Sequence, residues 1–180
     1  MIIAVIILVL LAILLVALYN RLAKQRVVVE EASSDIETFL KQRYDMIPNL
    51  VEIVKGYAKH EKSTFTEVTE LRAKAMGAGT LEQKMDIEAK LSQAVSKIIA
   101  VAENYPELKA NTNFLELQTN LKELENNIQK SRRYYNGAAR DFNTMIAVFP
   151  NNLLAGVFGF KKAVFFEATE EEKKNVDIKF

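Results

Sequence analysis

The 180-residue sequence contains no cysteine, one histidine, three prolines and six glycines. Without cysteine the chain cannot form a disulfide, a thiolate metal site or a cysteine nucleophile. A single histidine excludes the di-iron bundle sites that need a Glu-x-x-His pair on each of two helices. Because helix-breaking residues are scarce, we expect long regular elements.

Motifs that assemble catalytic chemistry are missing as well. The sequence has no Gly-x-Ser-x-Gly turn and no glycine-rich phosphate loop. His60 has Tyr57 three residues before it, where a metal-binding pair needs a carboxylate. The sequence therefore predicts a protein that is not an enzyme and uses no metal or cofactor, with an undescribed enzyme as an alternative.

Apolar residues are concentrated at the N-terminus, where residues 1–18 read MIIAVIILVLLAILLVAL. At about 1.5 Å per residue, a helix of this length crosses the hydrocarbon core of a bilayer. A cleaved signal needs a basic region before the run and a small-residue cleavage site after it, and a helix packed in a small domain needs a solvated face. The run has none of these features, so residues 1–20 are predicted to form a transmembrane anchor.

The residues that flank this anchor predict its orientation. Tyr19 lies where an interfacial aromatic residue is expected, and Arg21, Lys24 and Arg26 follow it. Basic residues stay preferentially on the cytoplasmic side and contact lipid headgroups. We therefore expect a single-pass protein of the cell membrane, with the N-terminus outside and the C-terminal body in the cytoplasm.

The charge of the body argues against nucleic-acid binding. Three of the 24 Lys and Arg residues flank the anchor, which leaves 21 against 23 Asp and Glu. A body with this slightly acidic balance lacks the basic surface that neutralises phosphates. The expected partners are the lipid bilayer and a membrane or cytoplasmic protein, and no nucleic acid.

Beyond the anchor, apolar residues recur at three- and four-residue steps, which is typical of amphipathic helices. Gly77, Pro106 and Pro150 each end one such segment. The predicted helices cover residues 21–44, 46–76, 81–105 and 113–149.

The first of these breaks depends on Pro48, which lacks the N–H that a helix interior requires. If Asp45 caps a second helix, Pro48 lies in its first turn, where that N–H has no intrahelical partner in any case. A kink in one continuous rod is the alternative, and it would give a three-helix coiled coil.

Long helices joined by short loops pack as antiparallel neighbours. The predicted fold is all-α: a transmembrane helix, then a four-helix up-and-down bundle over residues 21–160, and an irregular aromatic tail. This tail, residues 161–180, contains apolar residues that cannot all face water, so we expect it to fold back over an open end of the bundle. Apolar heptads in residues 113–149 also allow a homo-oligomer built through coiled-coil contacts.

Polar residues gather around the predicted break, and we consider them a candidate contact for a protein partner. They are Arg43, Asp45, Asn49 and Glu52. Capping and ordinary surface pairs would explain the same residues. A second cluster could form a polar layer between helices or another such contact, and it consists of Arg132, Arg133, Asn136, Arg140 and Asn143.

Several short motifs resemble the LemA family of bacterial membrane proteins. They are the segment RYDMIPNLVE at residues 43–52, Tyr19-Asn20, Tyr105-Pro106, Phe149-Pro150 and Phe158-Gly159-Phe160. The resemblance covers nearly the whole chain. It implies one N-terminal span and a helical bundle facing the cytoplasm, and it implies no known reaction.

The function predicted from these features is that of a membrane-anchored, non-catalytic helical adaptor or scaffold. It would position or regulate another protein at the inner face of the membrane. A self-assembling structural membrane protein is the alternative from a second class.

Overall fold

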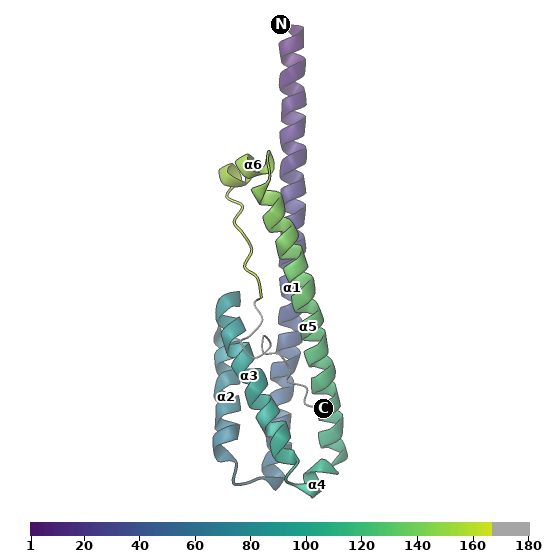
Figure 1. The fold of residues 1–180 in the computed structure, drawn as a ribbon, viewed down its shortest axis with the longest axis vertical. Coiled ribbons are helices and arrows are strands. Elements are labelled where there is room, and N and C mark those ends of the chain that lie inside the picture. Colours follow the sequence, from purple (N-terminus) through teal and green to yellow (C-terminus); the bar gives the residue numbers. More distant parts are fainter. Residues whose placement is uncertain (167–180) are drawn as a thin grey trace, which may run out of the picture. The chain divides into compact units, whose positions relative to one another are not determined.

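A computed structural model describes residues 1–166, apart from the side chains of residues 81 and 82. Over this range the chain is helical and contains no strand, which confirms the all-α prediction. Figure 1 shows the six helices, which are α1 (Ile2–Tyr57), α2 (Lys62–Gly77), α3 (Leu81–Ala102), α4 (Pro106–Lys109), α5 (Thr112–Ala147) and α6 (Asn151–Phe158).

The predicted break at Asp45 is wrong, because α1 continues through Pro48 and ends at Tyr57. Proline leaves the carbonyl of the residue four positions earlier without its helical N–H donor. Here that carbonyl belongs to Tyr44, and Arg72 of α2 donates its Nε–H to it over 2.6 Å. The contact from α2 replaces the missing hydrogen bond, so Asp45 lies inside the helix and caps nothing.

Two other helix starts follow local capping chemistry. The Thr80 hydroxyl accepts a hydrogen bond from the Gln83 N–H over 3.2 Å and caps α3, which begins at Leu81. At α5 the cap is Asn111, which accepts from the Phe114 N–H over 3.0 Å, so this helix begins at Thr112 rather than at residue 113.

The described residues divide into two compact units, and the second unit is a four-helix bundle. It contains residues 37–130 together with Phe166. Within it, α1, α2, α3 and α5 run in alternating directions, as Figure 1 shows. Its core consists of large apolar side chains with almost no exposure, among them Ile47, Leu50, Val54, Val68, Leu91, Ile98 and Ile128.

The first unit contains residues 1–36 and 131–165 and includes the apolar end of α1. The most apolar 18-residue stretch of α1 has a mean hydropathy of 3.4, and none of it is buried against the described chain. By length and composition α1 is long and apolar enough to cross a membrane. Further along, Leu22, Ala32 and Ile36 are buried, and so are Tyr135, Ala139 and Phe142 of α5.

After α6 the chain turns at Gly159 and runs beside α5. Gly159 has a φ of 70°, the left-handed conformation that favours glycine after a helix. The Asn143 amide then donates to the Ala163 carbonyl and accepts from the Ala163 N–H, both over 2.8 Å. Residues 163 and 164 therefore lie beside α5. Residues 167–180 of the predicted tail lie outside the described range, so its position over an end of the bundle stays a prediction.

Replacing Arg72 tests how α1 tolerates its proline. We expect Arg72→Leu to lower the free energy of unfolding by about 1–3 kcal/mol, because the Tyr44 carbonyl loses its donor. In a Pro48→Ala background, residue 48 supplies the helical N–H, so the same change should cost clearly less. A double-mutant cycle by urea unfolding in detergent micelles measures this coupling, and strictly additive effects would contradict it.

Candidate functional site

The structure separates the four residues predicted as a partner contact. Arg43 points into the second unit and is only 2% exposed, so it cannot contribute to a surface contact. Asp45, Asn49 and Glu52 are exposed on α1, at spacings of four and three residues that place them on one face. We call these three residues the Asp45 face.

Arg43 lies at the centre of a buried polar cluster. Its guanidinium forms an ion pair with Glu88 of α3, which is fully buried. Its Nη1 also donates to the Ser92 hydroxyl and to the Glu125 carboxylate of α5, each over 2.8 Å. The Tyr44 hydroxyl donates to Glu88 from the neighbouring position of α1. The cluster therefore links α1, α3 and α5 through charge-assisted hydrogen bonds.

Burial limits the chemistry that this cluster can perform. Glu88 has no exposed surface, so no substrate from solvent can reach its carboxylate in this structure. Across residues 1–166, no group of three or more His, Cys, Asp or Glu side chains is arranged to hold a metal ion. His60 lies exposed in the turn after α1. The buried cluster therefore fixes the packing of α1, α3 and α5.

The Asp45 face is open and polar. Asp45 accepts a hydrogen bond from Lys41 of the preceding helical turn over 2.7 Å, and both side chains are more than half exposed. An exposed pair of this kind contributes little to stability. This pair therefore gives Asp45 no large structural role, and all three residues are exposed to solvent.

The residues predicted to flank the membrane lie in the first unit, where two of them meet the aromatic segment after α5. The Tyr19 ring lies 4.8 Å from the Phe158 ring and 5.9 Å from the Phe160 ring, between centroids. The Arg26 guanidinium lies 5.8 Å from the Phe160 centroid, a cation–π distance, and also pairs with Glu30. Arg21 and Lys24 are exposed.

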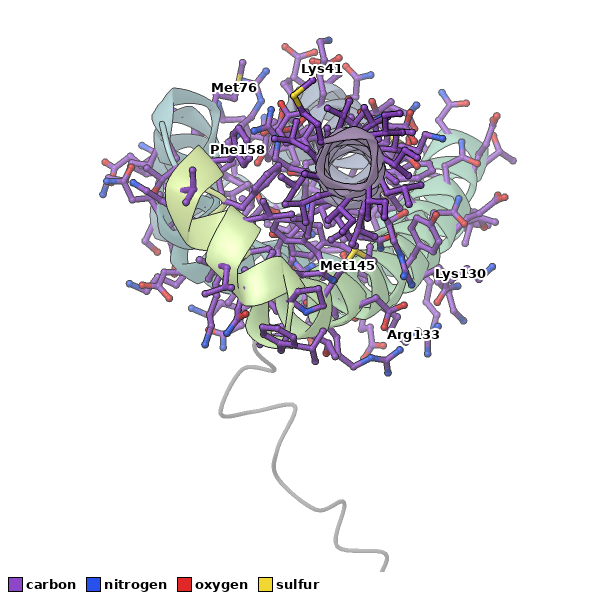
Figure 2. The ribbon with its side chains drawn as sticks, turned by 90° about the horizontal axis from the view of Figure 1, so that it is seen from above. Lys41, Met76, Lys130, Arg133, Met145 and Phe158 are labelled. Atoms are coloured by element: carbon purple, nitrogen blue, oxygen red, sulfur yellow. The ribbon has the colours of Figure 1, made fainter. Side chains whose placement is uncertain are left out.

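The residues of the second predicted polar cluster also differ in their environments, because some bind the backbone of the chain after α6 and others are exposed. Asn143 holds the chain after α6 through Ala163, as described above. Arg140 pairs with the adjacent Asp141, and Arg133 is exposed on the outer side of α5 (Figure 2). Tyr135, which the polar pattern did not include, donates its hydroxyl to the Val164 carbonyl over 2.9 Å. Burial raises the pKa of this phenol above 10.0, because the phenolate would lose solvation.

The comparison with known families agrees with the motifs. The sequence model of the LemA family matches residues 32–180, which includes the buried cluster and the Asp45 face. The chain belongs to the LemA family. The match begins after the apolar part of α1.

Curated relatives of this LemA-family protein come from several bacteria. Protein LemA of Metamycoplasma hominis is 24% identical over 159 residues, which cover 88% of this chain and 73% of the relative. Magnetosome protein MamQ 2 of Paramagnetospirillum magneticum is 28% identical over 175 residues, covering 83% of this chain. Magnetosome protein MamQ of Magnetospirillum gryphiswaldense is 23% identical over 174 residues, covering 82%. The match spans only 64% of the length of each of these two magnetosome relatives. Together with the apolar helix, these relationships identify a membrane-associated protein.

The buried ion pair makes a prediction about stability. Glu88→Leu leaves the Arg43 guanidinium buried beside an apolar group, and we expect it to lower the free energy of unfolding by about 3–5 kcal/mol. The double variant Arg43→Met/Glu88→Leu removes both charges and should be clearly more stable than Glu88→Leu alone. Urea unfolding of the micelle-bound protein measures both values.

A surface pair of the second unit serves as the control. Glu67 pairs with Lys97 over 3.2 Å, and both side chains are about half exposed. Glu67→Gln should therefore change the free energy of unfolding by less than about 1 kcal/mol. A comparable loss in Glu67→Gln and Glu88→Leu would show that the buried cluster has no special role.

The raised pKa of Tyr135 predicts a loss of stability in alkali. The neutral hydroxyl donates to Val164, so its contribution is complete below the unfolded pKa of about 10 and is lost as the pH rises through the higher folded pKa. Tyr135→Phe should be less stable by about 1 kcal/mol at neutral pH, and this difference should shrink above about pH 10. Unfolding curves of both proteins across this range test the prediction, which a pH-independent difference would contradict.

Proposed function

We propose that this LemA-family protein is a non-catalytic helical adaptor of the cell membrane. In this proposal a single span places the N-terminus outside, and the second unit presents a contact surface to a membrane or cytoplasmic protein. The observation that carries the proposal is the distribution of polar groups. The strongest polar cluster, around Arg43 and Glu88, is used in helix packing, whereas the Asp45 face remains open.

The orientation is supported by charge. Arg21, Lys24 and Arg26 all follow the apolar run of α1, and Arg21 and Lys24 are exposed immediately beyond it. Lys and Arg beside a span are retained preferentially on the cytoplasmic side. The second unit, which follows them in the chain, would then lie in the cytoplasm.

The packing of α5 favours the adaptor over a self-assembling structural protein. Intermolecular coiled-coil contacts would need an apolar stripe on the outside of this helix. The apolar residues of that stripe are instead buried within the protein, including Phe114, Leu121, Leu124, Ile128 and Phe142. Leu115 and Tyr134 are exposed on the same helix, but they lie nineteen residues apart and form no continuous stripe.

Cross-linking in native membranes tests the proposal. The wild type and an Asp45→Ala/Asn49→Ala/Glu52→Ala variant are purified through a C-terminal tag after cross-linking. We expect one discrete partner to be recovered with the wild type and lost with the variant, since the variant removes the polar groups of the Asp45 face.

The chain offers a matched control on α5. Glu116, Asn120 and Glu123 are exposed, have the same spacings of four and three residues, and carry nearly the same chemistry. Their triple alanine variant should retain the partner. Equal loss in both variants would argue against a specific contact at the Asp45 face, and recovery of this chain alone would favour self-assembly.

A further inference from the structure

Helix α6 exposes an apolar face on the side opposite its buried residues. Asn151 and Ala155 are buried, with exposures of 6% and 5%. Leu153 and Val157 lie on the opposite face and are 62% and 78% exposed, and Phe149 just before the helix is 78% exposed. A helix surrounded by water places its apolar residues against the core. The exposed apolar face of α6 is that of a helix whose outer side meets an apolar medium.

The position of α6 identifies that medium. Within the first unit, the Tyr19 ring of α1 packs against Phe158 at the end of α6. A groove of about 390 Å³ lies between the two helices and is lined by Leu15, Val16, Tyr19, Leu154, Val157 and Phe158. Figures 1 and 2 show α6 beside α1, with Phe158 labelled in Figure 2. The outer face of α6 is therefore continuous with the apolar surface of the predicted anchor.

Charged residues set the depth of α6 along α1. The apolar run ends near Tyr19, and Arg21 and Lys24 are exposed immediately after it. Lys161 and Lys162, which follow α6, are also exposed. Aromatic residues bordered by lysine and arginine mark the boundary between acyl chains and headgroups.

We propose that α6 is an interfacial helix, which inserts Phe149, Leu153 and Val157 into the acyl-chain region of the bilayer that the anchor crosses. Lys161 and Lys162 then face the lipid phosphates, and an acyl chain fills the groove beside Tyr19. Helices of this kind lie in the plane of the interface with their apolar face buried in lipid. The first unit thus contacts the membrane through two helices, α1 and α6. This inference depends on membrane insertion of α1 and is independent of the adaptor role.

The cysteine-free chain allows a direct test with the full-length protein. Single-cysteine variants Leu153→Cys and Val157→Cys are labelled with an environment-sensitive fluorophore and reconstituted into vesicles of phosphatidylcholine and phosphatidylglycerol. A nitroxide near the headgroup end of the acyl chains then quenches labels located in the bilayer. We expect blue-shifted emission and a loss of most of the fluorescence at both positions, as large as at Ile13→Cys in the anchor.

Leu115→Cys is the matched control, because Leu115 is an exposed leucine on α5 of the second unit. It should be quenched weakly. Weak quenching at both Leu153→Cys and Val157→Cys, with strong quenching at Ile13→Cys, would overturn the proposal. Disulfide formation between two copies at Leu153→Cys, with no quenching by lipid, would also overturn it and would assign the face to a second copy of the chain.

Discussion

The second unit depends on one buried charge. The Arg43 guanidinium has left water, and the interior tolerates it because Glu88 neutralises it and Ser92 and Glu125 accept its hydrogen bonds. A buried charge without its partners costs several kcal/mol, so helices that slide past one another lose this arrangement. One residue further along α1, Tyr44 binds Glu88 through its hydroxyl and Arg72 through its carbonyl. Two adjacent residues of α1 thereby hold all three of its neighbours, α2, α3 and α5.

The first unit differs from the second in that a large apolar surface faces outward. In a soluble domain the apolar part of α1 would be buried, yet here none of it is buried against the described chain. Lipid can solvate such a surface, provided that every backbone group is satisfied within the helix. The polar contacts of this unit lie away from that surface, where Asn143 and Tyr135 hold the backbone of residues 163 and 164. Its apolar and polar parts are thus separated along α1 in the way that a membrane boundary requires.

Local patterns were sufficient for much of the fold. The apolar run and the helical period are properties of neighbouring residues, and the helices predicted from them over residues 1–44 and 81–105 agree with the structure to within a few residues. The continuity of α1 through Pro48 could not be predicted in this way, because it depends on Arg72, 28 residues beyond Tyr44. The inward position of Arg43 likewise depends on Glu88 and Glu125, which lie on other helices.

The candidate site was predictable only in part. Asp45, Asn49 and Glu52 share an exposed helical face, which their spacing alone indicates. The sequence alone could not show that Arg43 is absent from the Asp45 face, because its inward position depends on contacts with other helices. The outward face of α6 could not be predicted either, since a short apolar segment reads the same whether it faces a core or a lipid.

The most direct test of the account is the side of the membrane on which the second unit lies. Asn113 is an exposed residue of α5 in the second unit. Because the chain has no cysteine, an Asn113→Cys variant can be labelled selectively in spheroplasts with a maleimide that does not cross membranes. Ile2→Cys at the start of α1 reports the opposite side. The account predicts that Asn113→Cys reacts only after the membrane is permeabilised, while Ile2→Cys reacts before. Full labelling of Asn113→Cys in intact spheroplasts would place the second unit outside and contradict it.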